Sequence, residues 1–166
     1  MMKYIRATKE DIPQIVEKRI AYLHEYHGGM SDDHVDDFIP KLTRYFEEHL
    51  NRTIYAYLAC DDERVVHAVA LLLVTEKPAR PSFINGKTGL VLNVYTEPGS
   101  RKQGHAEKLM QLLIEEARRF DLDYVELTAT ESGHPLYQKL GFRDLVFETK
   151  PMKLDLGMSI KQPLSA

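Results

Sequence analysis

The sequence predicts a single-domain α/β (α+β) protein, with a central mixed but mostly antiparallel sheet of about seven strands flanked by about four helices. Its 166 residues suit one domain and are enough to bury a hydrophobic core. Apolar residues recur at helical spacing in four stretches, and runs rich in β-formers separate them. The predicted order is one strand, two helices, three strands, a helix, a strand, a helix and two strands.

The first strand and the first helix are identified by the residues at which they begin and end. Residues 3–7 form a short apolar strand, and Thr8 then offers a helix N-cap, with Asp11 three positions later approximating a capping box. The first helix should end at Gly28–Gly29. A second helical stretch covers 35–50.

Pro40 lies within that second stretch, and a proline in a helix interior lacks the backbone donor that the helix needs. We therefore expect a break or kink there. The other elements follow from period and turn residues, with Ser132 as N-cap of the last helix and Gly141 as its end. We expect strands at 53–60, 64–75, 89–96, 124–129, 143–148 and 152–156, a loop at 76–87, and helices from Ala106 and Ser132.

Composition excludes several classes of protein. The net charge of −3 does not favour a nucleic-acid binder, and no apolar run is long enough to cross a bilayer. The N-terminus has no apolar core of the signal-peptide kind, and the single cysteine, Cys60, permits no internal disulfide. We expect a cytoplasmic protein. The seven histidines show no metal-binding spacing, so we expect no metal.

The most informative segment is residues 93–106, where a strand ends, a Pro-Gly turn follows, and a helix begins near Gly104. The start of a helix presents unpaired N–H groups and the positive end of the helix dipole, which together suit a phosphate. Gly104 permits close approach of the backbone, and Arg101 and Lys102 add positive charge. A tight turn without a ligand is the alternative interpretation.

Two other phosphate motifs do not fit. Gly99 and Gly104 have the spacing of a P-loop, but His105 and Ala106 stand where that motif needs Lys and Ser or Thr. The dinucleotide fingerprint with three glycines is absent.

Two blocks resemble the GNAT family of N-acetyltransferases. Residues 101–106 (RKQGHA) fit its R/Q-x-x-G-x-G/A signature, and residues 136–142 (LYQKLGF) are similar to its L-Y-x-K-x-G-F block. The resemblance covers about residues 4–156, which we take as the domain, with 157–166 as a C-terminal tail. His105 departs from the pattern, because the family usually has an aliphatic residue there.

The resemblance implies acetyl-CoA as co-substrate, lying where the central strand splays from the next one. Backbone groups of Tyr95 and Thr96 would bind the pantetheine arm, and Tyr137 would donate a proton to the departing thiolate. Tyr137 could instead be a core tyrosine with a satisfied hydroxyl. The pyrophosphate would be held by amides of Arg101, Lys102, Gln103, Gly104, His105 and Ala106.

The acceptor amine would lie between the first helical region and the facing strands. That region holds Tyr22, Tyr26 and His27, followed by four aspartates that could attract a cation but more simply complement a helix dipole. The aspartates are Asp32, Asp33, Asp36 and Asp37. His134 is a further candidate, and the carboxylates that could act as base are Glu76, Glu126 and Glu131, each also consistent with an ordinary surface charge.

The sequence therefore predicts an N-acetyltransferase that acts on a small-molecule amine by direct transfer in a ternary complex, since neither motif contains a cysteine to carry an acyl group. A peptide or protein N-acetyltransferase, and a non-catalytic acyl-CoA sensor or regulatory module, remain as alternatives. By resemblance we also expect a homodimer, with no nucleic-acid or membrane partner.

Overall fold

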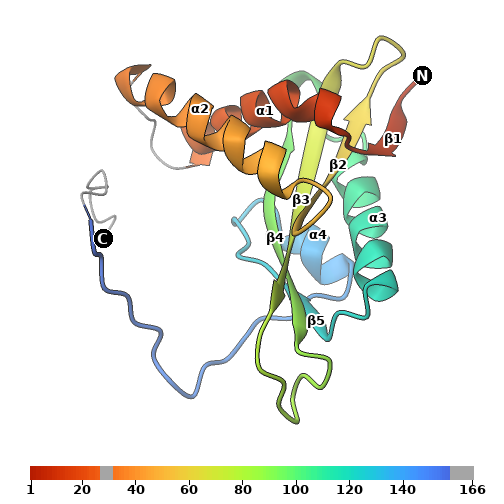
Figure 1. Cartoon of the computed structure of the whole chain (residues 1–166). Helices are drawn as coiled ribbons and strands as arrows, with labels where there is room; N and C mark the ends of the chain where they lie inside the picture. Colours follow the sequence, from red (N-terminus) through yellow and green to blue (C-terminus); the bar gives the residue numbers. More distant parts are fainter. Residues whose placement is uncertain (27–31, 158–166) are drawn as a thin grey trace.

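The computed structural model describes residues 1–26 and 32–157 (Figure 1). One five-stranded sheet has the order β1-β2-β3-β4-β5, antiparallel throughout except for the parallel pair β4 and β5. This confirms the α+β class and the mixed, mostly antiparallel sheet. The elements are β1 Lys3–Arg6, α1 Ile12–Tyr26, α2 Asp32–His49, β2 Ile54–Cys60, β3 Val66–Glu76, β4 Lys87–Thr96, α3 His105–Arg119, β5 Tyr124–Glu126 and α4 His134–Lys139.

The helices cover both faces of the sheet and divide its core in two. Side chains of α1 and α2, such as Ile15 and Phe46, pack with β2 and β3 on one face. Leu109 and Leu113 of α3 pack on the other face, where side chains of α4 join them. Alternating residues of the central strands serve both clusters, as expected for strands covered on both sides.

The start of α1 follows the predicted chemistry. The Thr8 N–H donates to the Asp11 carboxylate at 2.8 Å, around a short 3-10 turn over Lys9–Asp11. Arg64, from the turn between β2 and β3, pairs with the same carboxylate at 2.6 Å. Together these contacts hold the pKa of Asp11 below its usual value, although burial opposes the shift. The predicted end of this helix at Gly28–Gly29 lies outside the described residues.

The two closing strands are a correction. Residues 143–148 and 152–156 form no strand, so the sheet of the described chain has five strands rather than about seven. In Figure 1 this segment leaves the domain as an extended chain. Its apolar residues suggested strands, but a strand also needs a neighbour, and the three residues of β5 offer a very short edge.

Smaller differences have local causes. The last helix has Gly133 rather than Ser132 as N-cap, while Gly141 follows it with a left-handed φ of 96° as predicted. Helix α2 runs through Pro40 as one element, so of the predicted break or kink the break is wrong, and the kink stays a prediction. Pro40 is exposed, and buried Phe46 of the same helix packs on the sheet, so tertiary contacts outweigh the missing hydrogen bond. Within the described residues, no helix is long and apolar enough to cross a membrane.

Pro40→Ala should stabilise the fold, because it restores an N–H to the interior of α2 and removes the clash of the ring. We expect the free energy of unfolding to rise by about 1–3 kcal/mol, after the looser unfolded chain offsets part of the gain. Chemical denaturation measures it, with Lys41→Ala as the neighbouring exposed control, expected to stay within about 0.5 kcal/mol. A loss of stability would mean that the proline ring makes a contact the fold needs.

Candidate active site

The candidate site is a cavity that opens where β4 and β5 part. These strands pair only at Thr88–Tyr124, Gly89–Val125 and Leu90–Glu126. Beyond Leu90 a cavity of about 550 Å³ lies between them, within the usual size range of small-molecule sites. Its walls come from α1, the second half of β4, the start of α3, residues 127–130 and α4.

A bulge in β4 shapes this opening. Leu92 pairs with Leu71 and Tyr95 with Val69, so two residues of β4 oppose one of β3. Asn93, the first of the two, takes a left-handed φ of 52°, which asparagine adopts more readily than most residues. Its side chain is only 4% exposed and lines the cavity.

The start of α3 borders one end of the cavity. Gly104 is the N-cap, with a left-handed φ of 81°, and a Cβ there would meet nothing within 4 Å. The left-handed backbone conformation therefore explains the glycine at position 104, and the space where a side chain would lie is free. Lys102 also has a positive φ of 62°, and within the described chain no backbone acceptor is found for the N–H groups of residues 102–104. This cradle of donors fits a pyrophosphate.

His105 fixes the same helix start to the sheet. Its ring is buried, and Nδ1 shares a hydrogen bond of 2.8 Å with the Tyr4 hydroxyl on β1. Replacement of the usual aliphatic residue thus exchanges an apolar contact for a polar one. Its Nε2 is buried without a partner in the described part of the chain.

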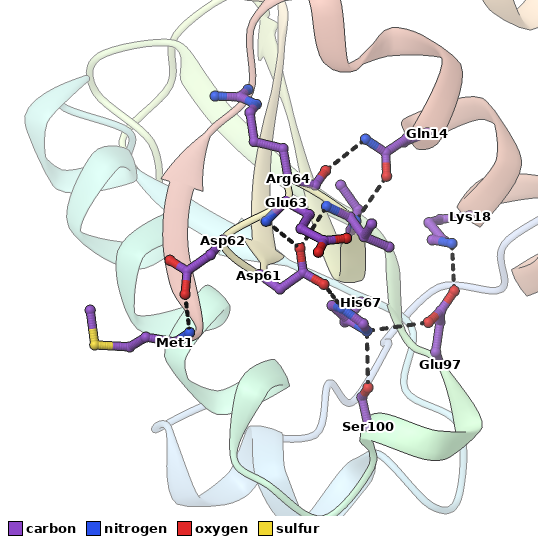
Figure 2. A network of polar contacts seen from close by, with 12 residues as sticks. Met1, Gln14, Lys18, Asp61, Asp62, Glu63, Arg64, His67, Glu97 and Ser100 are labelled. Carbon is purple, nitrogen blue, oxygen red and sulfur yellow. Dashed lines mark hydrogen bonds and ion pairs between the residues drawn. The ribbon is translucent and has the colours of Figure 1, made fainter.

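A polar network holds the segment that leads into this loop, as Figure 2 shows. Lys18 of α1, with a side chain 5% exposed, bonds Glu97 at 2.5 Å and Glu17 at 2.8 Å. Burial alone would lower the pKa of its ammonium, but the two carboxylates raise it above its usual value. On the other side, His67 lies within 3.5 Å of Glu97 and bonds Asp61 at 2.9 Å and Ser100 at 3.3 Å. The chain from β4 to α3 is therefore tied to α1 and β3.

The cofactor-binding residues expected from sequence fall into two groups. Tyr95 and Gln103 are not among the described residues of the cavity wall, and the Tyr95 ring packs in the core beneath α1. The Arg101 guanidinium bonds the Glu25 carboxylate at 2.6 Å and the Thr96 carbonyl at 3.0 Å. The backbone N–H of Arg101 donates to the Pro98 carbonyl at 3.4 Å. The residues that line the cavity are Thr96, Arg101, Lys102, Gly104, His105 and Ala106.

Tyr137 of α4 faces the cavity from the side opposite to β4. Its ring contacts Phe142 edge-on, and a Cβ on Gly133 would lie only 3.0 Å from it, so a larger residue at position 133 would press on the Tyr137 ring. Burial, with smaller contributions from Tyr22 and Tyr26, raises the pKa of Tyr137 to about 12. The phenol therefore keeps its proton at neutral pH.

Residues of α1 form another part of the cavity wall. Tyr22 and Tyr26 line it as expected, together with Leu23 and Arg19. Sequence reasoning did not identify Arg19 or Asn93, because neither belongs to a motif. His27 lies outside the described residues, as do the side chains of Asp32 and Asp33.

Several expected polar residues lie elsewhere. Asp36 and Asp37 are exposed and are not in the described wall of the cavity; they lie beyond the first turn of α2, which begins at Asp32. The carboxylates considered as a base are also absent from the described wall of the cavity; they are Glu76, Glu126 and Glu131. His134 instead bonds Asp144 at 2.7 Å.

Comparison with known proteins identifies the same architecture. The model of the acetyltransferase (GNAT) family matches residues 20–142. A predicted acetyltransferase from Clostridium acetobutylicum, crystallised with acetyl-CoA, is 30% identical, with a TM-score of 0.80 over 92% of this chain and 96% of that one.

Two more distant structures share the fold. A GCN5-related N-acetyltransferase from Ralstonia eutropha JMP134 is 24% identical, with a TM-score of 0.72 over 92% of this chain and 99% of that one. Glucosamine-6-phosphate N-acetyltransferase from Arabidopsis thaliana is 14% identical, with a TM-score of 0.62 over 92% and 98%. No curated protein matches the sequence.

Gly104→Ala should weaken binding of acetyl-CoA, the ligand of the Clostridium protein, because the methyl group enters the space beside the free amides. Gly141→Ala is a matched control, since its φ of 96° makes it similarly strained while it does not line the cavity. Each should lose about 1–2 kcal/mol of stability. By calorimetry, only Gly104→Ala should raise the Kd, by about tenfold. Equal affinity in both variants would contradict a phosphate site at this helix start.

Proposed function

Because the chain belongs to the GNAT family of acetyltransferases, and is thus an acyltransferase with acetyl-CoA as co-substrate, we propose that it acetylates the amine of a small molecule by direct transfer. The observation that carries this proposal is one cavity whose wall includes both the amide cradle at Gly104 and residues of α1. Tyr137 lines the same cavity.

The residues present fit acetyl-CoA, which supplies an activated acetyl thioester. The N–H groups of residues 102–106 would hold the pyrophosphate. Beyond Leu90, no strand of the described residues pairs with the edge of β4 toward β5, so backbone groups as far as Tyr95 and Thr96 are available to the pantetheine arm. These roles are proposed for the backbone, which is consistent with the Tyr95 side chain being turned into the core.

Tyr137 is proposed as the acid that protonates the departing thiolate. A phenol whose pKa is about 12 stays protonated at neutral pH, and it lies in the wall where α4 faces β4. No carboxylate among Glu76, Glu126 and Glu131 lines the described cavity, so we assign no side chain as base. The acceptor would lose its proton to water or arrive already neutral.

Direct transfer is supported by the position of the single cysteine. Cys60 is buried in β2, outside the described wall of the cavity, and burial raises the pKa of its thiol. A covalent acyl-enzyme on this thiol would need both access and ionisation, and the site offers neither. A free thiol is also consistent with a cytoplasmic protein, which we include in the proposal.

A peptide or protein substrate and a non-catalytic sensor are the competing functions. A thiol-release assay with acetyl-CoA separates them, using polyamines, amino acids, aminoglycosides and short peptides as acceptors. Turnover with a small amine supports the proposal, and turnover confined to peptides contradicts the substrate class. Tight acetyl-CoA binding with only background release across the panel favours a sensor.

Tyr137→Phe should lower kcat by about 10²–10⁴-fold while leaving acetyl-CoA affinity near that of the wild type, because only the hydroxyl is lost. With a raised pKa the proton of Tyr137 is retained below about pH 12 and lost only above it. The wild-type rate should therefore not fall between about pH 7 and 10, as the amine becomes neutral. Tyr55→Phe, whose hydroxyl bonds Arg52 away from the cavity, is the control. Normal turnover in Tyr137→Phe would exclude Tyr137 as the acid.

We also propose that two copies of the chain associate through residues 143–156. This segment exposes large apolar side chains that single proteins rarely leave in water. It follows α4, and in the described sheet β5 pairs with β4 alone and so has one open edge. Strand pairing between copies would supply the neighbour that the segment lacks among the described residues. The exposed residues are Leu145, Val146, Phe147, Met152, Leu154 and Leu156.

Val146→Asp should dissociate this dimer, because it would bury a charge where an exposed apolar side chain now stands. Sedimentation should give twice the chain mass of 19.2 kDa for the wild type and one chain mass for the variant. Ile84→Asp is a matched control, since Ile84 is also a highly exposed apolar residue and lies outside the segment. A monomeric wild type at micromolar concentration would overturn the proposed association.

A further inference from the structure

Arg19 of α1 is a partly buried cation without a carboxylate. Its one hydrogen bond in the described part of the chain is a long one of 3.4 Å, donated to the Asn93 side-chain oxygen, and no salt bridge is found there. Two nearby cations do have carboxylate partners. Lys18, one position earlier, bonds two carboxylates, and Arg101, which also lines the cavity, bonds Glu25. Burial lowers the pKa of Arg19, in keeping with a charge that lacks compensation.

Asn93 adds an unused donor at the same place. Its oxygen accepts from Arg19, and its side-chain nitrogen is buried with no partner in the described residues. A buried amide N–H without an acceptor costs about 1–3 kcal/mol, so such groups in a cavity wall point to a ligand. Both side chains line the same cavity. Together they present N–H donors and one uncompensated positive charge.

This pair lies where α1 meets the bulge of β4. Arg19 comes from the same helix as Tyr22 and Tyr26, and Asn93 from the part of β4 beyond its pairing with β5. Both side chains line the cavity that Tyr137 also lines, and neither belongs to the loop with the free amides. We therefore assign their donors to the acceptor rather than to the pyrophosphate.

We propose that Arg19 and Asn93 bind a carboxylate of the acceptor, so that the substrate is a small amine carrying a carboxylate close to its amino group. The inference rests on the proposed function and narrows its substrate class. A guanidinium donates two parallel N–H groups that match the two oxygens of a carboxylate, and the Asn93 amide adds a third donor. One uncompensated cation balances one negative charge, which favours a carboxylate over a phosphate dianion.

The test compares amino acids with their own carboxamides, which keep the amine and side chain but lose the negative charge. We measure kcat/KM for each pair with the wild type, Arg19→Gln and Arg118→Gln, the last removing an exposed arginine of α3 as control. The wild type and Arg118→Gln should prefer the acid by about tenfold or more, and Arg19→Gln should lose that preference. Arg19→Lys, which keeps the charge but not the paired donors, should be intermediate.

A binding measurement separates failure of this inference from failure of the proposed function. With CoA present, calorimetry compares an N-acetylated amino acid with its carboxamide, which needs no turnover. Selective binding of the acid that Arg19→Gln abolishes supports the carboxylate site even if no acceptor in the panel is acetylated. If carboxamides are acetylated as well as acids, or Arg19→Gln keeps the preference, the carboxylate site is overturned while acetyl transfer stands. Equal binding of both products overturns it as well.

Discussion

The early parting of β4 and β5 is the constraint on which the rest of the site depends. An unbroken sheet would separate its two helical layers, but these strands stop pairing after Leu90. The cavity therefore reaches from the start of α3 on one face to α1 on the other. Two molecules can enter from opposite faces and meet within the sheet, and a ternary complex needs this access. The bulge at Asn93 lies beside the opening, so the same local irregularity shapes the strand and supplies a polar side chain.

A site built on backbone amides must hold those amides still before the ligand arrives. Positive φ values at Lys102 and Gly104 shape the loop, and the segment before it is tied through Glu97 to Lys18. Buried ion pairs contribute little net stability, because desolvation offsets most of their attraction. The Lys18–Glu97 pair is better understood as fixing the exit of β4 relative to α1. Its value then lies in preorganisation, which reduces the entropy lost on binding.

Local signals in the sequence indicated two parts of the cavity wall but not Arg19 and Asn93. The turn before Gly104 and the block around Tyr137 are contiguous motifs, so their resemblance to the family's motifs was visible in the sequence. Arg19 and Asn93 are 74 positions apart, and only the packing of α1 over β4 joins them. The two closing strands failed for a related reason. Apolar residues in 143–156 indicate strands but do not identify a neighbour for them, and β5 ends after three residues. The break expected at Pro40 is wrong for the opposite reason, since packing of α2 outweighed a valid local rule.

The charges around the cavity are distributed differently from what the motif alone suggests. Arg101 stands in the signature, yet its guanidinium is compensated by Glu25 and turned back onto the Thr96 carbonyl. In the proposed complex, attraction for the pyrophosphate would then come chiefly from the amides and the dipole of α3, which do not depend on a mobile side chain. Within the described residues, the arginine of the cavity wall without a carboxylate partner is instead Arg19. A charge without a partner beside an unsatisfied amide costs stability unless a ligand completes it, and this is why we propose Arg19 and Asn93 as the residues that select the acceptor.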